Sequence, residues 1–188
     1  MAVNSFMVPL GTLAPPFTLP SLDGQIVTSD DFAPGRPLLV MFLSNHCPYV
    51  RHIERELGLL VAEYSERDVA AVAICSNDIE TYPADAPDGL TEQAHRAGFT
   101  FPYLLDGTQE VALVYRGACT PDFFLYDAGR KLVYRGEFDE SRPRNDTPVT
   151  GRALRAALEL VLAGQPVPEP QRPSMGCGIK WKPGNEPG

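Results

Sequence analysis

The sequence predicts an α/β domain built on a central mixed β-sheet flanked by helices. The first observation is an uninterrupted apolar run, Leu38–Leu43, which is typical of a strand buried on both faces. The second is the segment after Pro48, where apolar residues recur every three or four positions, as in an amphipathic helix. The third is another apolar run over residues 69–74, which completes a strand–helix–strand unit with parallel strands.

Length, composition and charge exclude several classes of function. The 188 residues are long enough for one domain with a proper core. The net charge of −8 argues against a nucleic-acid partner. No apolar run approaches the roughly 18 residues of a membrane span, and no secretory signal is visible, so we expect a cytoplasmic protein with no membrane partner. We expect residues 1–164 to form the domain and residues 165–188, rich in Pro and Gly, to form an irregular tail.

An N-terminal β-hairpin extension precedes the central strand. Phe17–Leu19 and Gln25–Thr28 have the composition of short strands, and Asp23-Gly24 between them favours a tight turn. Residues 29–32 read as the start of a helix, with acidic residues in its first turn. We expect residues 1–12 to be a loose lead-in.

The second half of the chain alternates helices with short strands. The Pro- and Asp-rich residues 82–89 indicate an exposed loop, and the helix that follows ends at Gly98. The expected elements are a helix over 90–97, an extended piece over 101–105, a helix over 108–115, strands over 123–126 and 131–135 joined by a turn, and a last helix over 148–163.

Cys47 is the candidate nucleophile. It stands just before Pro48, and proline is favoured at the first position of a helix, so Cys47 is the predicted N-cap. Unpaired backbone N–H groups and the positive end of the helix dipole stabilise a thiolate at that place and lower its pKa. We therefore expect an electron-rich sulfur that is open to solvent. The alternative is a structural cysteine in the core.

The spacing of the cysteines argues against a metal site. Cys47, Cys75, Cys119 and Cys177 are far apart and form no C-x-x-C pair, so we expect no zinc and no other cofactor. In a reducing compartment a structural disulfide framework is not expected either. Cys75 ends a buried strand, and we expect it to be core.

Three motifs resemble the thioredoxin superfamily, in the branch that holds the alkyl hydroperoxide reductase/thiol-specific antioxidant proteins and the TlpA/ResA-like oxidoreductases. Ala14–Leu19, followed by Asp23-Gly24, is similar to the opening of that branch. Val40–Leu43 ahead of Cys47-Pro48 resembles its active-site strand, and Thr120-Pro121 resembles its Thr–cis-Pro element. The resemblance implies a thioredoxin-like fold in which the Thr120-Pro121 loop faces Cys47.

The resemblance runs from about residue 10 to residue 163 and implies a thiol-disulfide oxidoreductase. Its partners would be protein or small-molecule disulfides and thiols. An extended substrate would pair with the backbone beside the cis-proline as an added strand. The groove that receives it would be formed by Ser44, His46, Pro48, Thr120 and Pro121.

Departures from the family pattern leave the reaction open. Val50 stands where a C-x-x-C motif has its second cysteine, so the usual resolving thiol is absent. Ser44 and Pro48 match the peroxiredoxin pattern around the peroxidatic cysteine, but Val40 replaces its proline and Pro121 its arginine. We favour a disulfide oxidoreductase. The alternatives are a thiol peroxidase that acts on peroxides and a non-catalytic binding module.

Two other cysteines are candidates to resolve a disulfide with Cys47. Cys119 lies two residues before Pro121 and comes within reach if that loop faces Cys47; otherwise it fills space in the loop. Cys177 sits between glycines in the tail, which could deliver it to Cys47. The alternative for Cys177 is a tail strand that packs Ile179 and Trp181 on the body and keeps the thiol inert.

Basic side chains flank the nucleophile. His46 and Arg51 are close to Cys47 in sequence, and a nearby cation lowers a thiol pKa. Each is equally well explained as a solvent-facing residue. His52 and His95 have no partner pattern, and we expect them on the surface.

Overall fold

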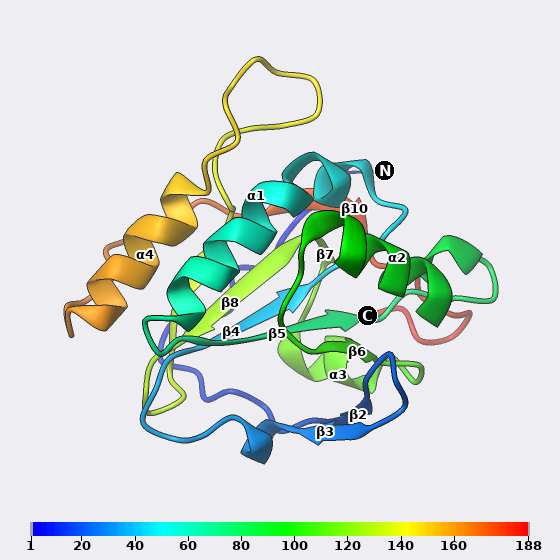
Figure 1. Cartoon of the computed structure of the whole chain (residues 1–188), viewed down its shortest axis with the longest axis horizontal. Helices are drawn as coiled ribbons and strands as arrows, with labels where there is room; N and C mark the ends of the chain where they lie inside the picture. Colours follow the sequence, from blue (N-terminus) through cyan, green and yellow to red (C-terminus); the bar gives the residue numbers. More distant parts are fainter. Residues whose placement is uncertain (1, 188) are drawn as a thin grey trace.

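The computed structural model describes residues 2–187 and has a five-stranded mixed sheet at its centre (Figure 1). Strand β4 (Leu38–Phe42) lies in the middle, parallel to β5 (Ala70–Cys75), which is parallel to β6 (Tyr103–Leu105). On its other side β4 is antiparallel to β8 (Asp122–Tyr126), which pairs with β9 (Leu132–Gly136). The predicted mixed α/β fold is confirmed.

Helices cover both faces of the central sheet, which creates two hydrophobic cores (Figure 1). Successive side chains of a strand point to opposite faces, so Met41 packs under α1 and Phe42 packs on the side of α3. Both side chains are fully buried. The helices are α1 (Pro48–Ser65), α2 (Pro87–Ala97), α3 (Glu110–Tyr115) and α4 (Arg152–Leu162).

The N-terminal hairpin forms as predicted. Strands β2 (Thr18–Pro20) and β3 (Ile26–Thr28) pair antiparallel, and the first turn after them is a 3-10 helix, η1 (Ser29–Asp31), rather than the start of a longer helix. The hairpin lies on the same side of the sheet as α3 (Figure 1).

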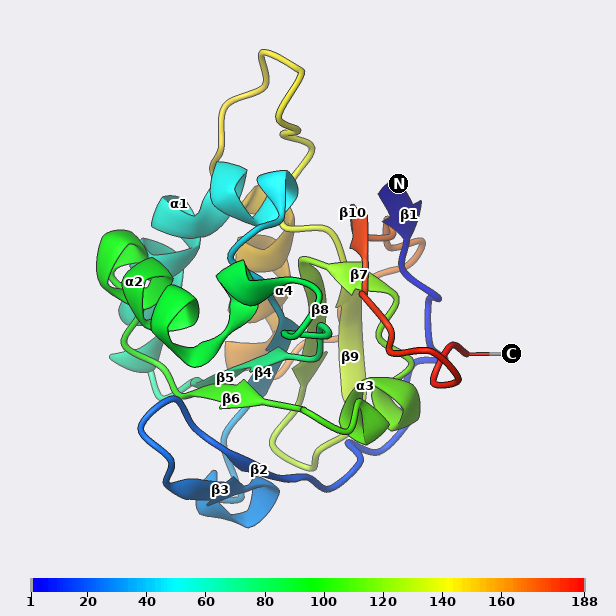
Figure 2. The ribbon, with the colours of Figure 1, turned by 90° about the vertical axis from the view of Figure 1, so that its right-hand side faces the viewer.

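The two ends of the chain meet in a second sheet that the sequence did not predict. Strands β1 (Ala2–Asn4), β10 (Met175–Gly178) and β7 (Cys119–Thr120) form an antiparallel sheet with β10 in the middle. Figure 2 shows β1 and β10 side by side next to β7. The predictions of a loose lead-in and of an irregular tail were wrong at β1 and β10, because strands this short have no readable periodicity and are defined only by distant partners. The alternative of a tail strand is correct, and Ile179 after it is buried in the second core.

The Pro- and Asp-rich stretch is not an exposed loop. It contains a 3-10 helix, η2 (Pro83–Asp85), and the first turn of α2, and Asp85 is fully buried. None of the helices within residues 2–187 has the length and apolarity that a bilayer crossing requires.

Candidate active site

Cys47 occupies the junction between β4 and α1. It is the N-cap of α1, and Pro48 is the first helical residue, as the sequence predicts. The exposed fraction of Cys47 is 0%, however, so the expectation of a solvent-accessible sulfur was wrong. The physical reason is that β7 and β10 lie over this junction, with Thr120 and Cys177 at the sulfur.

The Thr120-Pro121 loop faces Cys47, and the peptide bond between the two residues is cis. The sulfur of Cys47 lies 3.1 Å from the carbonyl oxygen of Thr120, to which a protonated thiol donates a hydrogen bond. The Thr120 hydroxyl is 3.0 Å from the hydroxyl of Ser44, and both side chains are buried. The structure therefore brings Ser44, Cys47 and the cis-proline loop together.

Cys177 is the thiol in contact with Cys47. It lies opposite Thr120 across the ladder between β7 and β10 and opposite Ala2 of β1. Hydrogen bonding by the Cys177 thiol to a Cys47 thiolate is the largest influence on the pKa of Cys47 and lowers it to about 5. Burial opposes the change, while the backbone of Val50 at the helix N-terminus adds to it. The same sulfur–sulfur contact, followed by burial, raises the pKa of Cys177.

The other two thiols are held in the protonated form. Burial raises the pKa of Cys119, whose sulfur lies 3.6 Å from the carbonyl oxygen of Pro121. Burial also raises the pKa of Cys75, which ends β5 inside the main core, as predicted. Within residues 2–187, Cys47 is therefore the cysteine whose pKa is lowered, whereas the pKa values of Cys75, Cys119 and Cys177 are raised.

The backbone edge beside the cis-proline is already occupied. Strand β10 pairs there with β7, where the sequence led us to expect an added substrate strand. The approach is close at Gly176, because a Cβ at this position would lie 2.0 Å from the carbonyl oxygen of Thr120. The expected open groove is thus filled by the tail of the same chain.

His46 is held by a buried carboxylate that the sequence did not reveal. The Nδ1 atom of His46 lies 2.5 Å from Oδ2 of Asp85, and Oδ1 of Asp85 accepts the backbone N–H groups of Asn45 and His46 at 2.7 and 3.0 Å. Burial works to raise the pKa of Asp85, but the hydrogen bonds from His46 and Asn77 outweigh it, and the pKa is lowered. The ionised carboxylate of Asp85 can only accept, so His46 donates from Nδ1, and its Nε2 atom is not bonded to Asp85.

The same polar cluster binds the end of the tail. Asn77 donates to Asp85 at 2.9 Å and accepts the backbone N–H of Lys180 at 2.8 Å. The ring of Tyr82 stacks on His46, with 5.1 Å between ring centroids, and the Lys180 ammonium lies 5.7 Å from the Tyr82 ring centroid. The backbone of Lys180 is thus linked through Asn77 and Asp85 to His46, the residue before Cys47.

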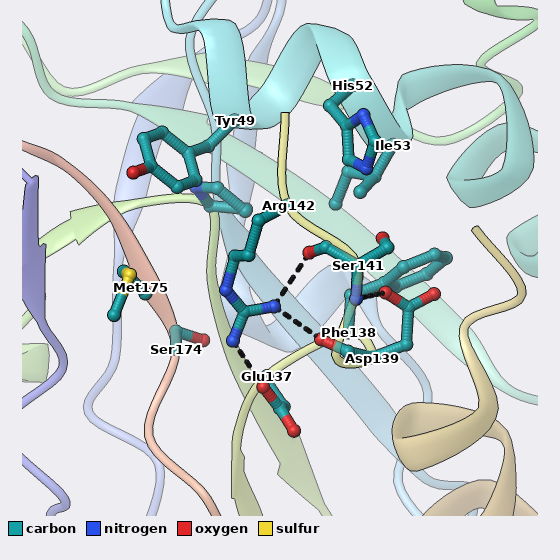
Figure 3. A pocket seen from close by; sticks show the side chains of 11 residues that line it. Tyr49, His52, Ile53, Glu137, Phe138, Asp139, Ser141, Arg142, Ser174 and Met175 are labelled. Atoms are coloured by element: carbon teal, nitrogen blue, oxygen red, sulfur yellow. Dashed lines mark hydrogen bonds and ion pairs between the residues drawn. The ribbon is translucent and has the colours of Figure 1, made fainter. Parts of the chain in front are cut away.

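A small pocket lies beside Pro121, between the first turn of α1, residues 137–142 and β10 (Figure 3). Its free volume of about 20 Å³ is space for one water-sized molecule. The Nε2 atom of His52 and the hydroxyl of Ser141 line it, and within residues 2–187 neither has a hydrogen-bond partner. His52 is therefore half-buried rather than a surface residue, whereas Arg51 and His95 are exposed.

The family model described as AhpC/TSA family matches residues 10–135, more than half of the chain. The chain belongs to the AhpC/TSA family. No match was found among proteins with curated functions.

Solved structures of similar fold were also found. An uncharacterized conserved protein from Geobacillus kaustophilus is 51% identical, with a TM-score of 0.94 over 97% of each chain. A hypothetical protein from Sinorhizobium meliloti is 45% identical, with a TM-score of 0.94 over 96% of this chain and 99% of that one. A thiol:disulfide interchange protein of the thioredoxin family from Chlorobium tepidum is 17% identical, with a TM-score of 0.63 over 82% of this chain and 98% of that one, which shows a shared fold.

Within this AhpC/TSA chain, the hydrogen bonds of Ser44 link it to the cis-proline loop and to α2. Its hydroxyl pairs with that of Thr120, and its carbonyl oxygen accepts from Gln93 at 3.1 Å. The Ser44 side chain is therefore bonded to the cis-proline loop, whereas Thr120 and Cys177 lie at the Cys47 sulfur. No group of three or more His, Cys, Asp or Glu side chains within residues 2–187 is arranged to hold a metal ion.

Proposed function

We propose that the protein is a thiol-disulfide oxidoreductase in which Cys47 is the nucleophile and Cys177 the resolving thiol. The placement of Cys177 carries this proposal: Cys177 lies opposite Thr120, whose carbonyl oxygen is 3.1 Å from the Cys47 sulfur, so a thiol that can later attack Cys47 is held beside it. The lowered pKa of Cys47 favours the thiolate, which is the nucleophilic form of the side chain.

The reaction balances with a disulfide as the oxidant. The Cys47 thiolate attacks one sulfur of the partner disulfide, forms a mixed disulfide and releases the other sulfur as a thiolate. Cys177 loses its proton and attacks the Cys47 sulfur, which forms the Cys47–Cys177 disulfide and releases the second partner thiol. Two electrons pass to the partner, and a dithiol or two small thiols must then reduce the protein.

The position of Cys119 supports Cys177 as the resolving thiol. Cys119 precedes Thr120 on β7, but its sulfur is directed to the carbonyl oxygen of Pro121. Its exposed fraction is 0%, and burial raises its pKa. Cys177 is half-buried, so it also has a path to solvent.

Peroxide reduction is the second candidate, and the complete burial of Cys47 favours it. Hydrogen peroxide is far smaller than a peptide and needs less opening to reach the sulfur. Cys47 would become a sulfenic acid as the peroxide leaves as water, and Cys177 would then expel a second water to form the same disulfide. A stopped-flow rate with hydrogen peroxide no faster than that of free cysteine would exclude this reaction.

The remaining alternative, a binding module without redox chemistry, requires an ordinary thiol at position 47. The lowered pKa of Cys47 argues against it. In the cytoplasm, where we infer that the protein acts, the pair would rest in the reduced state.

Disulfide mapping after mild oxidation with diamide tests the proposal. We expect a Cys47–Cys177 peptide pair in the wild-type protein and in C119A, and no intramolecular pair in C177A. Turnover of a model disulfide with dithiothreitol as reductant should be lost in C47A and kept in C119A. A Cys47–Cys119 pair, or no intramolecular disulfide at all, would overturn the assignment.

A further inference from the structure

The segment that covers Cys47 has few backbone pairs with β7. Strand β10 pairs with β7 at only two positions, Cys177 with Thr120 and Gly178 with Cys119. Its other neighbour, β1, is exposed at all three residues. Two of the four residues of β10 are glycines, which weaken a strand because they lose the most entropy and offer no side chain to pack.

Both ends of this segment are anchored more firmly than its middle. Ahead of β10, Ser174 donates its hydroxyl to the carbonyl oxygen of Gly136, and its N–H to the Ser5 hydroxyl at 3.0 Å. After β10, the carbonyl oxygen of Lys180 accepts from the N–H of Asp78 at 2.8 Å and from the Gln109 side chain at 2.9 Å. In this arrangement β10 can separate from β7 above the Cys47 sulfur while Ser174 and Lys180 keep the segment attached at both ends.

We propose that β10 is a displaceable cover over Cys47, and that Gly176 allows β10 to approach β7 closely enough to cover the sulfur. The proposal rests on the proposed function, since it adds the step that admits a partner to the same dithiol. When β10 lifts from β7, the sulfur of Cys47 and the backbone edge of Thr120 become free together. A partner segment that carries a disulfide can then pair with β7 in place of β10.

Gly176 is required for closure because of its distance from β7. A Cβ on residue 176 would lie 2.0 Å from the Thr120 carbonyl oxygen and 3.1 Å from the nitrogen of Pro121, both backbone atoms that cannot turn aside. Gly178, two residues along the same strand, offers a matched control. A Cβ there would lie 3.6 Å from the Val3 side chain, which is ordinary contact.

Thiol labelling of the reduced full-length protein in urea below the unfolding transition tests the cover without any mutation. Peptide mapping reports the modification rates of Cys47 and Cys75 separately. Cys75 is 2% exposed inside the main core, so its labelling should follow global unfolding and rise steeply with urea. We expect Cys47 to label faster than Cys75 and with little dependence on urea. Equal rates and equal urea slopes for the two cysteines would overturn the proposal.

The glycine pair supplies the second test. We expect Gly176→Ala to raise the labelling rate of Cys47 by roughly tenfold or more, the size of a typical overpacking penalty, and to leave Cys75 protected. Gly178→Ala should label like the wild type. Equal Cys47 rates in the two variants, or no increase in Gly176→Ala, would overturn the role of Gly176; if Gly176→Ala fails to fold, the urea series on the wild type decides.

These measurements separate the cover from the function beneath it. Labelling reports access to the Cys47 sulfur and needs no redox partner, whereas disulfide mapping reports the Cys47–Cys177 pair and needs no opening. If the Cys47–Cys177 disulfide is found but Cys47 is labelled only through global unfolding, the proposed oxidoreductase stands and the displaceable cover is excluded. Local labelling without that disulfide would keep the cover and exclude Cys177 as the resolving thiol.

Discussion

Cys177 lies opposite Thr120 in the ladder between β7 and β10, and this pairing brings its thiol to the sulfur of Cys47. The register is decisive, because a shift of one residue would put a glycine in that place. The thiol partner of Cys47 thus comes from the far end of the chain, in place of the missing second cysteine of a C-x-x-C motif. Strand pairing holds it there.

Removal of the Cys177 thiol should raise the pKa of Cys47. The hydrogen bond from Cys177 is the main stabiliser of the Cys47 thiolate, so we expect an upward shift of roughly 1–3 pH units in C177A. Serine keeps a hydroxyl donor, so C177S should shift less. The ultraviolet absorbance of the thiolate as a function of pH measures the change. C119A is the control and should titrate like the wild type; an unchanged pKa in C177A would show that the helix N-terminus alone lowers it.

Asp85→Asn should destabilise the fold by about 3 kcal/mol, the cost of breaking a buried, charge-assisted hydrogen-bond set. The asparagine would place its NH₂ group either against the N–H of Asn45, which now donates to Oδ1 at 2.7 Å, or against His46 Nδ1, which lies 2.5 Å from Oδ2. Urea unfolding measures the loss. Asp146→Asn makes the same charge change on an exposed residue and should alter stability by less than about 0.5 kcal/mol. Equal stability of the two variants would show that the Asp85 cluster contributes nothing to folding.

Asp122 should make the folded state less stable as the pH rises. Its carboxyl group is fully buried, burial raises its pKa to about 7, and no described group bonds its Oδ1 atom. An acid whose pKa is higher in the folded state than its ordinary value of 3.8 contributes full stability below pH 4 and loses it as the pH rises towards 7. The loss should be about 1.4 kcal/mol per pH unit in that window.

Asp122→Asn provides the comparison, because the amide has nearly the same shape and does not titrate. Urea unfolding from pH 4 to pH 7 should show the stability of the wild type falling relative to the variant by the slope given above. Parallel stability curves would mean that Asp122 titrates alike in the folded and unfolded chains.

The parts of the fold that follow from local sequence were predictable. The strand β4, the N-cap at Cys47 and helix α1 are contiguous, and a long apolar pattern together with Pro48 determines them. The cover over Cys47 was not predictable in the same way, since β1 and β10 are short and meet only in the folded chain. Asp85 was missed for a related reason: in a Pro-rich stretch nothing local distinguishes a buried carboxylate from a solvated one.

The choice between two resolving thiols shows the same limit of sequence reasoning. Cys119 is adjacent to the cis-proline loop in sequence and was the natural first candidate. Which sulfur reaches Cys47 depends on the face of β7 to which each side chain points and on the strand that pairs with it. Those are properties of the sheet, so the sequence could name the tail thiol of Cys177 only as the second candidate.

Ser44→Ala should test whether Ser44 serves the chemistry or the fold. The Ser44 hydroxyl is 3.0 Å from that of Thr120, and both residues are buried. We expect a loss of stability of about 1 kcal/mol, the net value of one buried hydrogen bond, and an unchanged rate of Cys47 with peroxide. Thr120→Val removes the partner hydroxyl at constant shape, so the double variant should lose less than the sum of the two single losses. If the two losses simply add while the peroxide rate falls in Ser44→Ala alone, the Ser44 hydroxyl acts on Cys47 directly, and the peroxidase becomes the better account of this site.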